Sequence, residues 1–191
     1  MRQEDNLILI GFMGSGKSSV GVKLSYRLRK PVEDTDKLIE RSEGRTIREI
    51  FAGEGEEYFR RQETELLREL VGKREGRIFS VGGGTPLREE NRELLKKLGK
   101  VVYLRACPET IYARIQGDTT RPLLQCENPL QRIRELLDSR SAAYEACADC
   151  IVDVDGLDMD AVLKKIVKET EKMKLLVING PNINFLGIRE K

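Results

Sequence analysis

Apolar and polar positions alternate along most of the chain in two different periods. Five short segments, most of them apolar, predict strands: 7–10, 31–34, 77–81, 101–104 and 151–154. Longer stretches between them place apolar residues every three to four positions and predict helices: 18–29, 36–41, 46–51, 56–71, 89–98, 108–115, 129–146 and 159–172. Strands that alternate with helices favour an α/β fold, with a mostly parallel five-stranded sheet and helices on both faces.

The end of the chain departs from this alternation. Residues 174–178, of which the last four are apolar, directly follow a charged helical stretch and predict a further strand, after which Asn179 opens a loop. A single strand with no sheet to join is marginally stable, so we expect this end to be disordered or to pair with a neighbouring chain. The pattern divides the chain into a main domain, residues 1–172, and a tail, residues 173–191.

Composition narrows the classes of partner and of chemistry. Lys and Arg total 34 against 32 Asp and Glu, a net charge of +2, which gives no reason to expect a nucleic acid or a membrane as partner. The N-terminus resembles neither a signal peptide nor a membrane span, and the four cysteines suit reduced thiols, so we expect a cytoplasmic protein. The chain has no histidine, which excludes Ser-His-Asp and Cys-His catalytic systems.

Residues 11–18 match the phosphate-loop pattern G-x-x-x-x-G-K-[ST] between an expected strand and an expected helix. Its glycines let backbone N–H groups surround phosphate oxygens, and the following helix adds its positive N-terminal end. Lys17 is expected to bridge the β- and γ-phosphates of ATP and the Ser18 hydroxyl to ligate Mg²⁺. The expected nucleotide contacts within the loop are Gly14, Ser15, Gly16, Lys17, Ser18 and Ser19.

Candidate acceptor residues follow the second and third strands. In an extended segment, Asp34 and Asp36 could point the same way, one toward Mg²⁺ and one toward an acceptor hydroxyl, although Asp36 could equally be a helix N-cap. Arg60 could line a site or belong to a charged, solvated helix face. The three glycines at 82–84 could form a flexible turn or allow a ligand to approach the backbone.

Taken together and in this order, these segments resemble the shikimate kinase family over roughly residues 7–170. The resemblance rests on the phosphate loop, Asp34-Thr35-Asp36, Phe59-Arg60 with Glu63, Gly82-Gly83-Gly84, Arg121-Pro122-Leu123-Leu124, and Arg140 with Tyr144. It implies a P-loop kinase three-layer sandwich with a mobile lid at about 116–128. It also implies ATP-dependent phosphorylation of the 3-hydroxyl of shikimate, a step of chorismate and aromatic amino acid biosynthesis.

The resemblance implies roles on the acceptor side. Asp36 would orient or deprotonate the attacking hydroxyl. Arg60 and Arg140 would hold the shikimate carboxylate, and the backbone of Gly82, Gly83 and Gly84 would line the same pocket. A guanidinium group suits this task because its planar fork matches a carboxylate.

On the nucleotide side, the resemblance implies that Asp34 and Ser18 hold Mg²⁺, Asp34 through water. Arg121 would close onto the phosphates from the lid and would be catalytic together with Lys17 and Asp36. Arg114 and the segment after Val152 would border adenine. The family's kinase domain would be monomeric.

The tail resembles the beginning of a type II 3-dehydroquinate dehydratase through the run Asn-Gly-Pro-Asn-Ile-Asn-Phe-Leu-Gly-Ile-Arg-Glu. Asn182 and Arg189 would match active-site positions there, whereas the catalytic tyrosine and histidine of that family would lie beyond Lys191. The resemblance implies a fusion to, or a contact with, such a domain; an ordinary last strand of the kinase remains an alternative.

Two other functions stay open at this point. Another small-molecule P-loop kinase, such as a gluconate kinase, would also bind a polyol carboxylate through arginines. A regulatory module could bind ATP without turnover, although Lys17 and Arg121 argue against it. Consumption of ATP only when an acceptor is present would separate an enzyme from such a module.

Overall fold

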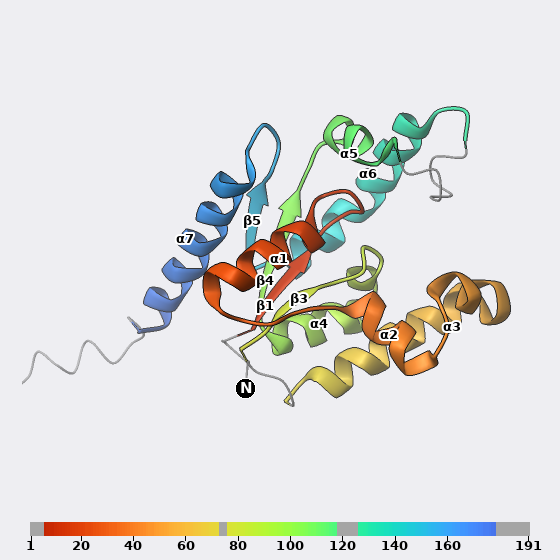
Figure 1. Ribbon diagram of the computed structural model, residues 1–191, viewed down its shortest axis with the longest axis horizontal. Coiled ribbons are helices and arrows are strands. Elements are labelled where there is room, and N and C mark those ends of the chain that lie inside the picture. The colour runs from red at the N-terminus through yellow and green to blue at the C-terminus, as the bar shows by residue number, and fades with distance from the viewer. Residues whose placement is uncertain (1–5, 73–75, 118–125, 179–191) are drawn as a thin grey trace, which may run out of the picture.

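The computed structural model describes residues 6–72, 76–117 and 126–178, with side chains described as far as Glu171 (Figure 1). Its strands form one sheet in the order β2-β3-β1-β4-β5, and each neighbouring pair is parallel. The strands are β1 (Leu7–Ile10), β2 (Val32–Asp34), β3 (Ile78–Ser80), β4 (Lys100–Arg105) and β5 (Cys150–Asp153). The α/β class and the five-stranded sheet expected from the sequence are confirmed.

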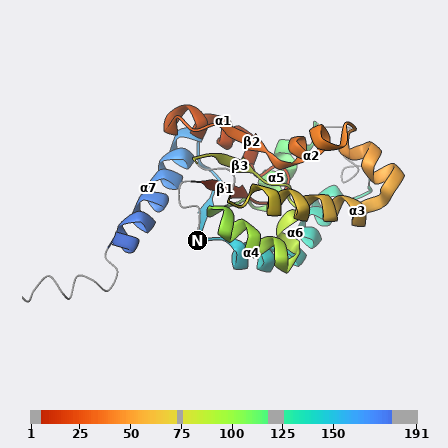
Figure 2. The same ribbon diagram turned by 90° about the horizontal axis from the view of Figure 1, so that it is seen from below.

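Helices cover both faces of this sheet, which makes three layers (Figure 2). Helices α1 and α7 pack together on one face, and α4 and α6 lie on the opposite face. The described helices are α1 (Lys17–Leu28), α2 (Thr35–Glu43), α3 (Ile47–Leu70), the short 3₁₀ helix η1 (Thr85–Leu87), α4 (Glu89–Leu98), α5 (Pro108–Ile115), α6 (Pro129–Cys147) and α7 (Met159–Ile178).

The register of the sheet aligns the carboxyl ends of its strands. Strand β1 lies in the middle of the core, with Ile8, Leu9 and Ile10 fully buried. Ser80 of β3 lies opposite both Leu9 of β1 and Asp34 of β2. The loops that follow these three strands therefore leave the sheet at one edge, where parallel sheets bind their ligands.

Helices α2 and α3 form an arm beside the sheet, drawn in orange in Figure 1. A small separate core of Ile39, Ile50 and Phe59 holds the two helices together. Thr46 and Glu49 make the expected capping box, in which Glu49 accepts from the Thr46 backbone N–H at 2.7 Å. Gly55 interrupts α3 with a φ of 81°, which explains why the sequence predicts two helices there.

The strand expected at residues 174–178 is wrong, because these residues continue helix α7 to Ile178. A sixth strand would need an open sheet edge for its backbone hydrogen bonds, whereas an extension of α7 makes those bonds within the helix. Residues 179–191 lie outside the described residues, so the expectations of disorder or of pairing for them stay untested. Among the described helices, none is both long enough and apolar enough to cross a membrane.

Candidate functional site

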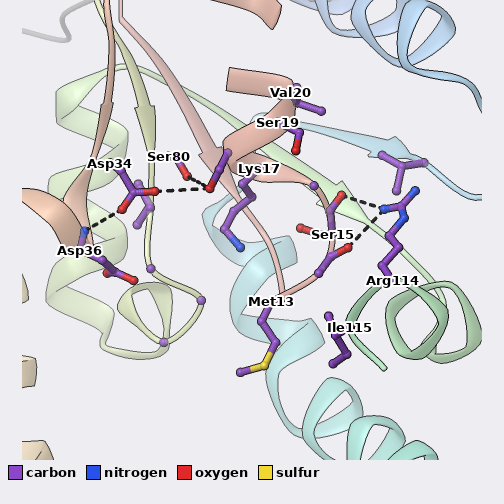
Figure 3. A pocket seen from close by; sticks show the side chains of 18 of the residues that line it. Met13, Ser15, Lys17, Ser19, Val20, Asp34, Asp36, Ser80, Arg114 and Ile115 are labelled. Carbon is purple, nitrogen blue, oxygen red and sulfur yellow. Dashed lines mark hydrogen bonds between the residues drawn. The ribbon is translucent and has the colours of Figure 1, made fainter. Parts of the chain in front are cut away.

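A cavity of about 810 Å³ opens at the carboxyl edge of the sheet (Figure 3). The loops after β1, β2 and β3 form its floor, and α3, α5, α6 and the start of α7 contribute its walls. Every candidate site residue that the structure describes lines this cavity: Gly14, Ser15, Gly16, Lys17, Ser18, Ser19, Asp34, Asp36, Arg60, Gly82, Gly83, Gly84, Arg114 and Arg140. Arg121 lies outside the described residues.

The phosphate loop has the backbone that its pattern requires. Gly16 adopts a φ of 99° immediately before α1, a left-handed conformation that glycine tolerates best. No side chain caps the N-terminus of α1, and its first turn contains no acidic residue. The N–H groups and the positive end of this helix dipole are therefore placed to bind an anion.

Two cations from different parts of the chain hold the carbonyl groups of this loop. Lys17 donates from Nζ to the carbonyl oxygens of Gly11 at 2.8 Å and Phe12 at 3.0 Å. Arg114, from the end of α5, donates from Nη1 to the carbonyl oxygens of Gly14 at 3.3 Å and Ser15 at 3.2 Å. Both positive charges thus lie beside the site where the loop would receive a phosphate.

Asp34 joins the second strand to the phosphate loop. Its Oδ1 caps α2 by accepting from the backbone N–H of Asp36 at 3.1 Å, while its Oδ2 accepts from the Ser18 hydroxyl at 3.4 Å (Figure 3). The N-cap considered for Asp36 is therefore wrong, because Asp34 occupies that position. The extended path considered for the two aspartates is also wrong, since α2 begins at Thr35.

The oxygen atoms around Ser18 suit a small, hard cation. Its hydroxyl lies 3.4 Å from Asp34 Oδ2 and 3.5 Å from the hydroxyl of Ser80, a residue that sequence reasoning did not select. Only the position of Ser80 at the end of a strand could have indicated it. Within the described residues, no group of three or more His, Cys, Asp or Glu side chains could hold a metal. Such a donor set suits Mg²⁺, which usually takes one or two carboxylates and completes its shell with water and phosphate.

The surroundings of Asp36 disfavour the ionised form of its carboxyl group. Its Oδ1 is buried and has no hydrogen-bond partner within the described residues. Burial, and after it the nearby charges of Asp34 and Glu63, raise the pKa of Asp36 to about 6 against the opposing charges of Lys17 and Arg60. A carboxyl group with this pKa is mostly ionised at pH 7 and well matched to accept a proton from a bound hydroxyl.

Arg60 is held on the arm side of the cavity by carboxylates. Its Nη1 donates to the buried Glu63 at 2.8 Å, and its Nη2 donates to Glu56 at 2.9 Å. Arg140 of α6 approaches from another wall, with its guanidinium carbon 5.5 Å from the centre of the Phe12 ring. The alternative that Arg60 belongs to a solvated helix face is wrong, because its side chain lines the cavity.

Apolar side chains complete the wall nearest α5 and α7. Val154, Leu157 and Met159 follow β5, in the segment expected to border adenine, and Ile115 stands beside the phosphate loop. Ile47 lines the arm side, and nothing in its sequence context marks it as a site residue. The cavity thus has a cationic loop in its centre, an apolar wall on one side, and two guanidinium groups with a carboxyl group on the other.

Comparisons with known proteins agree on one family. The family model described as shikimate kinase matches residues 13–171. A shikimate kinase from Thermodesulfovibrio yellowstonii is 44% identical over 168 residues, which cover 88% of this chain and 96% of that protein. One from Cupriavidus pinatubonensis is 45% identical over 166 residues, or 87% of this chain and 86% of that protein.

Solved structures extend the comparison to the fold. A shikimate kinase from Acinetobacter baumannii in complex with shikimate has a TM-score of 0.79 and 37% identity, covering 94% of this chain and 97% of that one. A gluconokinase from Sinorhizobium meliloti reaches a TM-score of 0.56 at 15% identity, covering 94% of this chain and 99% of that one. At that identity the second likeness shows a shared fold alone.

Proposed function

The chain belongs to the shikimate kinase family, and from that premise we propose how its cavity carries out the reaction. The activity is ATP-dependent phosphorylation of shikimate at its 3-hydroxyl. One observation carries the assignment of roles: a phosphate loop and a pair of guanidinium groups line the same cavity, with Asp36 between them. A phosphoryl donor and a carboxylate-bearing acceptor can therefore meet over that carboxyl group.

The donor, ATP, is proposed to occupy the side of the cavity next to α1 and α7. Its phosphates would lie against the uncapped N-terminus of α1, where Gly14 to Ser19 supply N–H and hydroxyl groups. Lys17 would leave its carbonyl partners for the β- and γ-phosphates. The adenine ring would lie between Arg114 and the apolar residues Val154 and Leu157, where apolar side chains line the cavity.

Mg²⁺ is proposed to bind between the phosphate loop and β2. The Ser18 hydroxyl and Asp34 Oδ2 would hold it, since these adjacent oxygens are of the type that Mg²⁺ prefers. When bound, the ion supplies positive charge that neutralises the transferring phosphoryl group. Asp34 can serve both the helix and the ion because its two oxygens face different partners.

Shikimate is proposed to occupy the side next to the arm. Arg60 and Arg140 would grip its carboxylate, and the glycine backbone at 82–84 would lie against it. As the 3-hydroxyl oxygen forms its bond to the γ-phosphorus, Asp36 takes the hydroxyl proton. The bond between that phosphorus and the β,γ-bridging oxygen breaks at the same time, and ADP leaves with the electron pair.

The remaining expectations are proposals that rest on the resemblance alone. Arg121 is proposed to reach the phosphates from a lid at 116–128. Residues 1–172 are proposed to form a monomeric, cytoplasmic kinase domain. The tail, residues 173–191, is proposed to be related to the start of a dehydroquinate dehydratase and to be fused to or in contact with such a domain, although its first residues continue α7 as far as Ile178.

A coupled assay of ADP release tests the proposed function. Mg²⁺ and ATP would be supplied with shikimate, gluconate, quinate or AMP in parallel reactions. ADP release that depends on shikimate, together with a phosphorylated product in equal amount, is expected. Release with gluconate instead would support the neighbouring kinase class, and release without any acceptor would reduce the function to ATP hydrolysis.

A further inference from the structure

The glycine turn, residues 82–84, is held at its two ends by threonines. The Gly82 N–H donates to the hydroxyl of Thr35 at 3.2 Å, and the Thr85 N–H donates back to the Gly82 carbonyl at 3.2 Å. Three successive glycines have more backbone freedom than any other tripeptide and carry no side chains to pack. The middle of the turn therefore needs a restraint from elsewhere in the molecule.

That restraint comes from α6. The Tyr144 hydroxyl donates to the Gly83 carbonyl oxygen at 2.6 Å, across 61 positions of sequence. A Cβ atom at Gly83 would lie 3.4 Å from the Gly11 carbonyl oxygen and 3.8 Å from the Tyr144 hydroxyl. Gly83 is thus enclosed between the phosphate loop and Tyr144.

The ring of Tyr144 is itself fixed. It is fully buried and packs against Tyr103 with ring centres 5.1 Å apart. Burial raises the pKa of Tyr144 to about 12, with Arg140 opposing the rise, so the hydroxyl keeps its proton and remains a donor at every physiological pH. Among the described residues that line the cavity, Tyr144 is absent, whereas Gly83 and Arg140 are present.

Arg140 precedes Tyr144 by four positions on α6, so the two side chains lie on the same face of the helix. We propose that Tyr144 is a positioning residue for the acceptor: its hydroxyl fixes the Gly83 peptide relative to Arg140. The glycine backbone and this guanidinium group would then meet the acceptor carboxylate in a single arrangement. This inference rests on the proposed function, because the acceptor is the shikimate of that reaction.

Steady-state kinetics of Tyr144→Phe test the inference, with Tyr103→Phe as the matched control. Both substitutions remove one hydroxyl from a buried, mutually packed tyrosine, but only Tyr144 bonds Gly83. For Tyr144→Phe, the KM for shikimate should rise about three- to tenfold, because the hydroxyl's hydrogen bond to Gly83 and its interaction with Arg140 are both lost. The KM for ATP should stay within twofold, and both constants should stay within twofold for Tyr103→Phe.

Amide hydrogen exchange of Gly82 and Thr85, whose N–H groups are hydrogen-bonded in the turn, gives a readout independent of activity when it is followed by NMR without substrates. Exchange should become several-fold faster in Tyr144→Phe and remain unchanged in Tyr103→Phe. Unchanged exchange, an equal rise of both KM values, or the same effect in Tyr103→Phe would overturn the inference. Failure of the unsubstituted protein to phosphorylate shikimate would instead overturn the proposed function, so the two failures are distinguishable.

Discussion

At the scale of the residue, Asp36, the proposed general base, lowers the stability of the folded protein at neutral pH. The carboxyl group is buried, one of its oxygens has no partner among the described residues, and its pKa is raised to about 6 from an ordinary 3.8. The folded protein therefore keeps the proton of Asp36 up to a higher pH than the unfolded chain does. Stability from this group is complete below about pH 4 and is lost as pH rises through about 6.

We expect Asp36→Asn to be more stable than the unsubstituted protein at pH 7.5, by about 1–3 kcal/mol in the free energy of unfolding. The difference should shrink as pH falls through 6 and vanish near pH 3.5, since both side chains are then neutral. Turnover should fall by at least about a hundredfold, because no carboxylate remains to take the proton. Urea unfolding at several pH values checks the first expectation; a constant difference across pH would contradict it.

Arg60 and its neighbour Arg61 offer a matched pair on one helix. Arg60 lines the cavity, whereas Arg61 is exposed and lies over the ring of Tyr58. Arg60→Ala should raise the KM for shikimate by the equivalent of about 1.5–3 kcal/mol, with a small effect on the KM for ATP. Arg61→Ala should leave both unchanged. A rise in the KM for ATP alone would indicate that Arg60 lies on the nucleotide side of the cavity rather than on the acceptor side.

At the scale of the element, the glycine turn needs glycine for space rather than for backbone angle. Gly84 has a φ of −93°, which any residue adopts. A Cβ atom there would overlap the Arg60 guanidinium group, the mobile end of a long side chain. Alanine would therefore push Arg60 aside without straining the backbone.

Gly84→Ala should raise the KM for shikimate about 10- to 100-fold, through loss of a charge-assisted contact, and should lower the unfolding temperature, because the displaced guanidinium group weakens its ion pair with the buried Glu63. Gly53→Ala is the control: a Cβ there would meet its nearest neighbour, Arg45 Nη1, at 3.9 Å. That variant should keep its kinetics and gain about 0.5–1 kcal/mol of stability. An unchanged KM for shikimate in Gly84→Ala would show that the methyl group does not displace Arg60.

The sequence correctly predicts those elements whose structure is determined by local residues alone. The strand at 7–10, the phosphate loop and the capping box of Thr46 follow from apolar runs, glycine spacing and a local hydrogen bond. The sequence does not predict the helical structure of residues 174–178, because such a short, mostly apolar run fits a strand as well as a helix.

The candidate site residues that the structure describes all line one cavity, but the sequence predicts the local roles of some of them wrongly. Asp34, rather than Asp36, caps α2, and the choice depends on where β2 stops. Ser80 and Ile47 reach the cavity only through the packing of distant segments. Contacts of that kind are set by tertiary structure, and the local sequence gives at most the position of Ser80 at the end of a strand.

At the scale of the whole molecule, the strand order explains why the proposed sites of the two substrates lie apart. Strand β1 is central, with β3 and β2 on one side and β4 and β5 on the other. The proposed acceptor residues Asp36 and Gly83 follow β2 and β3, whereas Arg114 and Leu157, proposed to border adenine, follow β4 and β5. Arg140 is the exception, a proposed acceptor residue on α6, which also follows β4. The phosphate loop stands between the two sets of residues at the end of β1.

This division has a consequence for the kinetic scheme. Since the two substrates are proposed to occupy different parts of the cavity, neither must leave before the other binds, and both must be present for transfer to occur. Initial rates measured over a grid of ATP and shikimate concentrations should give double-reciprocal lines that intersect, the signature of a sequential mechanism. Parallel lines would indicate a ping-pong scheme, in which the protein itself first accepts the phosphoryl group. Two separate, simultaneously occupied substrate sites do not need such an intermediate.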